Sequence, residues 1–324
     1  MVHPIDNANE NSPYGSLTRE EFYVKNHILH HKKFMLNNQN MKIYTQSWRP
    51  DLDHSTPLRG FVGMIHGYTT ESSWLLELSA VAIAKSGFLV SSLDLQGHGY
   101  SEGYPGHIPN IEHVVDDCVQ LFDSIRAENP NIPAFLYGES LGGAIAILMS
   151  LKQKKEWNGL ILHGAMCGVS KSIKPIWPIE KLLPVAACIA PKWKIVITRP
   201  PESMSYKEVW KRKLVAKSPN RRRLASGKPL AATALEFLRV CEFIERNCYE
   251  IEVPLMVVHG GEDRVCEPKS AKKFYEMVSS KDKSLQIVKG MWHMLIGEPN
   301  ETVELVFGNI MSWICKRADQ YNQC

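Results

Sequence analysis

The sequence has 324 residues, of which 44 % are hydrophobic and 22 % charged, as in an ordinary soluble protein with one large domain or a domain carrying an insertion. Its net charge is only +4 and its longest basic run is Arg221-Arg222-Arg223, which argues against a nucleic-acid partner. The longest apolar runs, such as AIAIL, fall far short of the roughly 18 residues of a membrane span, and the start MVHPIDNANE lacks the apolar core of a signal peptide. We therefore expect a cytoplasmic protein. Whether part of its surface contacts membranes is left open by these patterns.

The eight cysteines form no C-x-x-C pair, and none lies with histidines at metal-ligand spacing. Reduced thiols, mostly buried as small apolar residues, fit this pattern. We expect neither a structural metal nor a disulfide framework.

Apolar runs of strand length alternate with helical patterns along the chain. Apolar residues recur at helical spacing between residues 111 and 125, with Asn110 available as N-cap, and again between 303 and 314. The predicted strands lie at 42–48, 61–65, 89–93, 134–137, 159–162, 255–258 and 285–288. Most lack polar alternation, as expected of strands covered on both faces. This order predicts an α/β fold with a mostly parallel central sheet flanked by helices.

The alternation is interrupted in the second half of the chain, where prolines and basic residues replace the strand pattern in segments such as KPIWPIEKLLPV and SYKEVWKRKLV. We predict a core of residues 1–167 and 247–324, and a mostly helical insertion, residues 168–246. Such an insertion would cover the carboxyl edge of the sheet, where ligands bind in open α/β folds. A long structural connection is the alternative.

The stretch FLYGESLGG, residues 135–143, places Ser140 where a predicted strand runs into an apolar helix. The pattern G-x-S-x-G is short enough to occur by chance, so its context decides. In a nucleophile elbow the serine sits on a tight strand-to-helix turn that exposes its hydroxyl at the top of a parallel sheet. Gly142 and Gly143 suit a helix that approaches the sheet closely.

A nucleophilic serine needs a base and a group that orients the base, and the sequence supplies an acid and then a histidine in the order expected after such a turn. Asp263 follows the predicted strand 255–258, and His293 follows the strand 285–288. Each residue alone could be a turn former or a structural side chain, and Glu262 is a rival acid. Order and position together predict a triad of Ser140, Asp263 and His293.

The stretch FVGMIHGYTT supplies a second element of this chemistry. Acyl transfer needs N–H donors aimed at the developing oxyanion. Their usual sources are the residue after the nucleophile, here Leu141, and the loop after an early strand, which points to the N–H of Tyr68. We expect the ring of His66 to organise this loop and not to transfer protons.

The glycine-rich stretch LDLQGHGYSEG, residues 93–103, matches neither phosphate-binding pattern, because it has no G-x-x-x-x-G-K-[ST] and no G-x-G-x-x-G that opens a helix. We interpret it as a loop that shapes the edge of the fold. Asp94 and His98 are expected to be structural.

With these residues the chain resembles the plant monoacylglycerol lipase branch of the α/β-hydrolase superfamily, which also contains caffeoylshikimate esterase-like enzymes. The resemblance covers about residues 1–318, through the motifs MVHPIDNANENSPYGSL, EEFY, MIHGY, LDLQGHGYSEG, PAFLYGESLGGAIA, APKWKIV, GKPLAATALEFLR, VVHGGEDRVCEP and WHMLIGEP. It implies an α/β-hydrolase fold in which the insertion is a cap that forms the acyl-binding tunnel.

The resemblance also implies the role of each site residue. Ser140 would be the nucleophile, Asp263 the orienting acid and His293 the base, while Tyr68 and Leu141 would supply the oxyanion N–H groups. The implied reaction is cleavage of a carboxylic ester through an acyl-enzyme, with no metal or organic cofactor. The favoured substrate is a small amphiphilic ester of the monoacylglycerol type.

Three alternatives stay open: an esterase of hydroxycinnamoyl or other specialised-metabolite esters, a serine acyltransferase, and a receptor derived from a hydrolase. An apolar, basic cap would also permit peripheral contact with anionic lipid surfaces. The sequence departs from the family pattern at Thr69 and Thr70, at Tyr100 and in the stretch ITRPPESMSYKEVWKRK. We expect these departures near the pocket or its roof, where they bear on the substrate more than on the chemistry.

Overall fold

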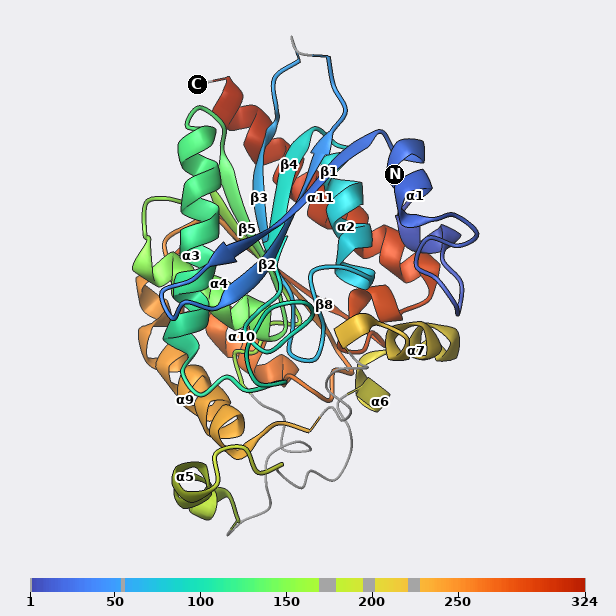
Figure 1. The fold of residues 1–324 in the computed structure, drawn as a ribbon. Helices are drawn as coiled ribbons and strands as arrows, with labels where there is room; N and C mark the ends of the chain where they lie inside the picture. The colour runs from blue at the N-terminus through green and yellow to red at the C-terminus, as the bar shows by residue number, and fades with distance from the viewer. Residues whose placement is uncertain (1, 54–55, 169–178, 195–201, 221–227, 324) are drawn as a thin grey trace.

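The computed structural model describes residues 2–53, 56–168, 179–194, 202–220 and 228–323. Within these residues the centre of the molecule is an eight-stranded sheet (Figure 1). From edge to edge the strands are β1 (Ile28–Leu36), β2 (Lys42–Pro50), β4 (Phe88–Leu93), β3 (Gly60–Ile65), β5 (Ala134–Glu139), β6 (Gly159–His163), β7 (Leu255–Gly260) and β8 (Lys283–Val288). Neighbours from β4 to β8 pair in parallel, whereas β2 is antiparallel to both β1 and β4. The predicted α/β fold with a mostly parallel sheet is confirmed.

The seven predicted strands are all present, but the sequence analysis did not predict β1. This strand lies at the sheet edge and pairs only with β2 among the described residues. Most of its side chains are exposed, including Lys32 and Lys33. An edge strand with charged side chains does not need the continuous apolar run by which buried strands are recognised.

Helices cover both faces of the sheet (Figure 1). Those with buried residues in one core cluster are α2 (Leu75–Ala84) and α11 (Asn300–Asn322), and those in the other are α3 (Ile111–Glu128), α4 (Leu141–Lys152) and α10 (Pro268–Met277). Strand β5 contributes to both clusters, because Phe135 and Tyr137 point to the first and Leu136 to the second. The predicted N-cap of α3 is present, since the Asn110 side chain accepts a hydrogen bond from the Glu112 N–H.

The segment between β6 and β7 carries the helices α5 (Ile179–Ile189), α6 (Glu202–Ser205), α7 (Val209–Ala216) and α9 (Ala231–Asn247), which lie together at one end of the sheet (Figure 1). The region of α6 and α7 is tied to the core, because Lys207 and Glu208 donate backbone N–H groups to the carbonyl of Gly297. Helix α5 packs on α9, and the Ala231 N–H donates to the carbonyl of Trp193.

The N-terminal segment, with η1 (Pro4–Asn7) and α1 (Arg19–Lys25), packs against α2. Its centre is the fully buried carboxylate of Glu77, which pairs with Arg19 and accepts hydrogen bonds from the hydroxyls of Tyr14 and Tyr23. A capping box of Thr18 begins α1. These buried polar contacts fix the N-terminal segment to the core.

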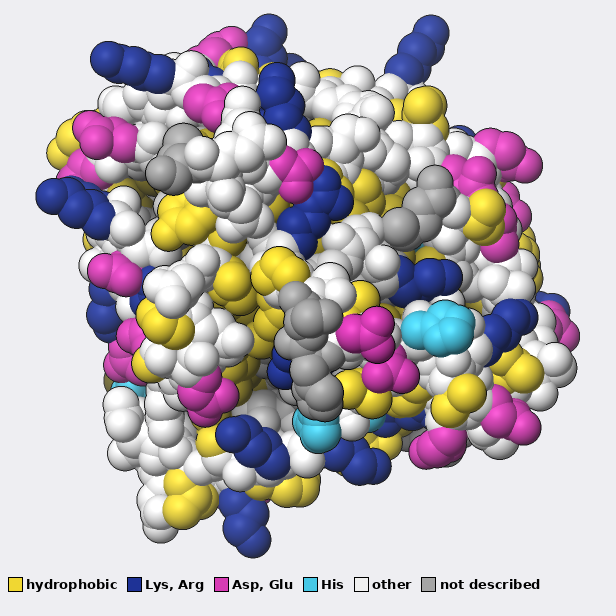
Figure 2. Space-filling view, turned by 90° about the horizontal axis from the view of Figure 1, so that it is seen from above, with side chains coloured by type: hydrophobic (Ala, Val, Ile, Leu, Met, Phe, Trp, Pro, Cys, Tyr) yellow, Lys and Arg dark blue, Asp and Glu magenta, His cyan; other side chains and the backbone are white. Residues whose placement is uncertain are grey.

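Charges of both signs are interspersed on the face of the molecule seen in Figure 2, so the small positive net charge forms no single-sign field there. The basic run 221–223 lies outside the described residues. In the part of the chain that the structure describes, no helix combines the length and the apolar character needed to cross a bilayer.

Candidate active site

Ser140 occupies a strained turn between β5 and α4. Its backbone has φ 56° and ψ −116°, a conformation that a residue with a side chain rarely adopts. Neighbouring backbone holds it there: the Ser140 N–H donates to the carbonyl of His163, and the Ser140 carbonyl accepts from the N–H groups of Gly143 and Met166. The strand-to-helix turn expected from the sequence is therefore present.

Two glycines allow the chain to approach this turn closely. A Cβ atom on Gly142 would lie 2.1 Å from the carbonyl oxygen of Ile65, so any larger residue would push α4 away from the sheet. A Cβ atom on Gly67 would lie 3.1 Å from Cβ of Ser140. The loop after β3 thus passes directly beside the serine.

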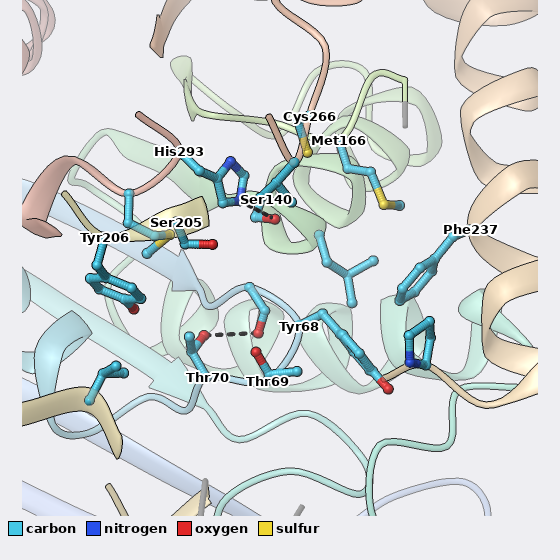
Figure 3. Close-up of a pocket in the computed structure, with 16 residues that line it drawn as sticks. Tyr68, Thr69, Thr70, Ser140, Met166, Ser205, Tyr206, Phe237, Cys266 and His293 are labelled. Atoms are coloured by element: carbon cyan, nitrogen blue, oxygen red, sulfur yellow. Dashed lines mark hydrogen bonds between the residues drawn. The ribbon is translucent and has the colours of Figure 1, made fainter. Parts of the chain in front are cut away.

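The structure brings the three residues of the predicted triad together. Nε2 of His293 lies 2.9 Å from Oγ of Ser140, and Nδ1 of His293 lies 2.7 Å from Oδ2 of Asp263. A dashed line in Figure 3 marks the hydrogen bond between His293 and Ser140. Asp263 and His293 are buried, whereas the rival acid Glu262 is exposed. Asp263 is therefore the acid that contacts the histidine.

Asp263 accepts hydrogen bonds through both of its carboxylate oxygens. Oδ1 accepts from the N–H groups of Val265 and Cys266, at 2.8 and 3.0 Å. Oδ2 contacts Nε2 of a second histidine, His259, at 3.1 Å, in addition to His293. Burial alone would raise the pKa of Asp263, but the charges and hydrogen bonds of the two histidines hold this pKa well below its ordinary value. The acid is thus an ionised carboxylate that orients the imidazole of His293.

His293 lies on the loop between β8 and η3 (Leu295–Gly297), and neighbours on both sides hold this loop. The Leu295 N–H donates to Nε2 of His163, at the end of β6, at 3.1 Å. The Met294 N–H donates to the carbonyl of Ser205 in α6 at 3.0 Å. One contact comes from the central sheet and the other from the segment between β6 and β7, so both parts position the histidine.

The two predicted oxyanion residues lie beside Ser140. Leu141 is the first residue of α4, where a backbone N–H has no partner inside the helix. Tyr68 follows Gly67, the residue whose Cα lies against the serine. Leu141 and Tyr68 both line the cavity into which Ser140 opens. Their position is compatible with the predicted role.

The ring of His66 uses both of its nitrogen atoms inside the fold. Nε2 accepts the Leu95 N–H at 3.0 Å, so the proton sits on Nδ1, which donates to the carbonyl of Gly67 at 2.7 Å. Burial lowers the pKa of His66 to about 4, which keeps the ring neutral. The side chain thus supports the loop that carries Tyr68.

The cavity above the serine is mostly apolar. Its apolar walls are formed by Tyr68, Leu141, Met166, Val215, Pro229, Phe237, Val265 and Met294. In Figure 3, Tyr68 and Phe237 lie at one end and Tyr206 lies at the opposite end, with Ser140 between them. The rings of Tyr68 and Phe237 are 5.1 Å apart and nearly perpendicular. An ester held at Ser140 would therefore extend toward two different ends of one cavity.

The departures from the family pattern lie in different places. Thr69 and Thr70 line the cavity, as expected, and so do Ser205 and Tyr206 from the altered stretch between β6 and β7. Tyr100 does not belong to the described lining, because its half-exposed ring packs against Tyr44. The residues ITRPP, 197–201, lie outside the described part of the chain.

Several residues of the site were not predicted from the sequence. His259 lies near the end of β7, four residues before Asp263, and this position was the only signal for it in the sequence. Cys266 is buried at the cavity beside Ser140, and burial raises the pKa of its thiol well above the ordinary value. Among the described residues, no group of three or more His, Cys, Asp or Glu side chains could hold a metal ion.

The sheet, the strained serine turn and the strand-end loops define an α/β hydrolase. Residues 56–300 match the family model described as "Serine aminopeptidase, S33", and the chain belongs to this family. It is 31 % identical to the caffeoylshikimate esterase of Arabidopsis thaliana, over 95 % of this chain and 92 % of the relative. It is 26 % identical to the human monoglyceride lipase, over 87 % of this chain and 90 % of that protein.

Solved structures support the fold. A soluble variant of the Saccharomyces cerevisiae monoglyceride lipase superposes with a TM-score of 0.76 at 20 % identity, covering 88 % of this chain and 94 % of that one. The monoacylglycerol lipase of Paleococcus ferrophilus superposes with a TM-score of 0.71 at 24 % identity, covering 86 % of this chain and 100 % of that one. With esterases and monoglyceride lipases as its relatives in sequence, the chain is a carboxylic-ester hydrolase.

Proposed function

We propose that the protein cleaves carboxylic esters through an acyl-enzyme formed on Ser140. The observation that carries this proposal is the continuous path of hydrogen bonds from Asp263 through His293 to a serine that opens into a cavity. Nε2 of His293 takes the proton of the serine hydroxyl while Oγ bonds to the acyl carbon. The same proton then passes to the alcohol oxygen as the ester C–O bond breaks.

Water completes the cycle at the same histidine. His293 accepts a proton from a water molecule that attacks the acyl-enzyme, and returns it to Oγ of Ser140 as the carboxylic acid leaves. We assign the N–H groups of Tyr68 and Leu141 to the oxyanion of both tetrahedral intermediates. The step needs no group beyond these residues, the ester and water.

The favoured substrate is an ester of the monoacylglycerol type. The apolar cavity supports this choice, and the relatives named monoglyceride lipases support it as well. Esters of hydroxycinnamic acids are the second candidate, because the paired rings of Tyr68 and Phe237 suit a flat aromatic acyl group and one relative is named a caffeoylshikimate esterase.

We further propose that residues 168–246 act as a cap and that α5 makes peripheral contact with membranes. Leu182, Val185 and Ile189 are exposed by 59, 54 and 79 %, and their spacing places them on one side of α5. Trp193 follows the helix and is also exposed. A cytoplasmic protein with such a surface would draw substrate from lipid.

Sedimentation with liposomes tests this contact. Changing Leu182 and Ile189 together to serine is expected to lower the fraction bound to anionic vesicles. The matched control is Leu305→Ser, an exposed leucine on α11. Equal binding of the double variant and the native chain would contradict the membrane proposal.

A panel of monoacylglycerols and hydroxycinnamoyl esters, analysed by mass spectrometry, tests the proposed reaction. Ser140→Ala is expected to reduce release of acid about 10⁴- to 10⁶-fold without loss of the folded state. Near-native turnover by this variant would overturn the mechanism. An added alcohol that becomes acylated in place of water would indicate an acyltransferase, and absence of turnover with the native chain would favour a receptor.

A further inference from the structure

The loop after β3 carries Tyr68, the assigned oxyanion donor, in a four-residue turn from Gly67 to Thr70. The Thr70 N–H closes this turn by donating to the carbonyl of Gly67 at 3.3 Å. Thr69, the third residue of the turn, has φ 67°. A positive φ at this place is typical of a type II turn, which favours glycine or asparagine there and not a β-branched residue. The threonine therefore strains the turn that carries the Tyr68 N–H, and contacts from outside the turn must hold it in this shape.

One such contact comes from Asn220, a residue 150 positions further along the chain than Thr70. Nδ2 of Asn220 donates to the carbonyl of Thr70 at 2.8 Å, and Oδ1 accepts the N–H of Gly99 at 2.8 Å. Because one partner can only accept and the other can only donate, they fix which end of the amide carries the nitrogen. The backbone N–H of Asn220 also donates to Oε2 of Glu71 at 2.9 Å. Asn220 is fully buried and thus bridges two loops of the core.

The Gly99 end of this bridge rests on a part of the core that is itself held in place. The fully buried carboxylate of Asp94 accepts the N–H of Tyr100 through one oxygen, at 2.8 Å, and the N–H of Ser72 through the other, at 2.7 Å. Any side chain on Gly99 would collide with the same carboxylate, so the backbone passes closely over it. The amide of Asn220 therefore ties the strained turn to a fixed support.

Asn220 lies outside the described wall of the cavity, whereas Tyr68, Thr69 and Thr70 line it. Figure 3 shows these three loop residues together on one side of Ser140. A donor in an oxyanion hole must lie about 2.7–3.1 Å from the oxyanion. A small displacement of the turn would thus weaken the contribution of the Tyr68 N–H and leave the triad in place.

We propose that Asn220 is a positioning residue for ester cleavage, whose side-chain amide holds the turn of residues 67–70 so that the Tyr68 N–H stays aimed at the oxyanion. This assignment deepens the proposed function and rests on it, since it takes the Tyr68 N–H as a donor to the tetrahedral intermediates. The segment between β6 and β7 then acts on the reaction through a loop of the core, in addition to lining the cavity.

Asn220→Leu tests this role in the full chain, with p-nitrophenyl butyrate as substrate. We expect kcat to fall about tenfold while KM stays within about twofold, because the oxyanion donor stabilises the transition state more than the bound ester. The inhibition constant of butylboronic acid, which forms a tetrahedral anion on a catalytic serine, should rise by a similar factor. If this variant yields too little folded protein, Asn220→Ser takes its place, since its side chain is too short to bridge the two backbone partners.

The matched control is Asn37→Leu, in the turn between β1 and β2. Asn37 is also buried, its Oδ1 accepts the N–H of Met41 at 2.8 Å, and its Nδ2 donates to Asp117. This change should lower the thermal stability to a similar extent as Asn220→Leu. It should leave kcat and the inhibition constant of butylboronic acid unchanged.

The outcomes separate the positioning role from the reaction. Native values of kcat and of the boronic acid constant in Asn220→Leu, a rise in KM alone, or equal losses in Asn37→Leu would overturn the role of Asn220 while ester cleavage stands. A native chain that cleaves no ester would overturn the proposed reaction and the role of Asn220 with it.

Discussion

Nε2 of His259 lies 3.1 Å from the same carboxylate oxygen of Asp263 that contacts His293. The carbonyl of Cys266 lies 3.2 Å from the same nitrogen, so both neighbours are acceptors and the proton sits on Nε2. Asp263 is therefore held by a histidine on each side. Only one of the two reaches the serine.

Replacing His259 by leucine should weaken this arrangement without removing any reacting group. We expect kcat/KM for a p-nitrophenyl ester to fall about tenfold, because Asp263 loses one of its hydrogen bonds. Asp263→Asn is the comparison and should cost about 10⁴-fold, since the wrong tautomer of His293 is then favoured. Native activity in His259→Leu would show that Asp263 needs no second histidine.

Gly142→Ala should reduce both stability and activity. The added Cβ would meet the carbonyl oxygen of Ile65, and the displacement of α4 would move Ser140. Urea denaturation should give a free energy of unfolding lower by about 1–3 kcal/mol. Gly308→Ala on α11, where a Cβ meets nothing within 4 Å, is the control and should be neutral or slightly stabilising. A loss of equal size in both variants would contradict the close approach as the cause.

The protonation of Glu71 predicts how stability depends on pH. Its pKa is about 8 in the folded chain against an ordinary value of 4.5, so the folded state binds this proton more tightly than the unfolded state. The stabilisation is complete below pH about 4.5 and is lost as the pH rises through about 8. Thermal unfolding should show a smaller decline over this range in Glu71→Gln than in the native chain.

Glu77→Ala should destabilise the N-terminal segment strongly. It leaves Arg19 and the hydroxyls of Tyr14 and Tyr23 without their shared acceptor, at an expected cost of about 3–5 kcal/mol in the free energy of unfolding. Circular dichroism in urea measures this loss. Glu10→Ala removes the exposed ion pair with Lys213 and should leave stability nearly unchanged, so similar effects of both changes would argue against the buried network.

Local patterns in the sequence were sufficient to predict the strands that are covered by helices on both faces of the sheet. Strand ends and chain order also indicated Ser140, Asp263 and His293, because each follows an apolar strand directly. The exposed edge strand β1 was not predicted, because its lysines interrupt any apolar run. The packing of Tyr100 on Tyr44 could not be predicted either, because a motif letter does not reveal which way a loop turns.

The walls of the cavity could not be predicted in the same way. Phe237 and Tyr206 come from the segment between β6 and β7, and only the packing of this segment on the core brings them to Ser140.

The hydrogen bond from the Met294 N–H to the carbonyl of Ser205 links the position of α6 to the position of the catalytic base. It joins α6 to the residue beside His293, and the turn after α6 is bound to the carbonyl of Gly297. A displacement of α6 from the core would break these bonds, and the loop that carries His293 would lose part of its support.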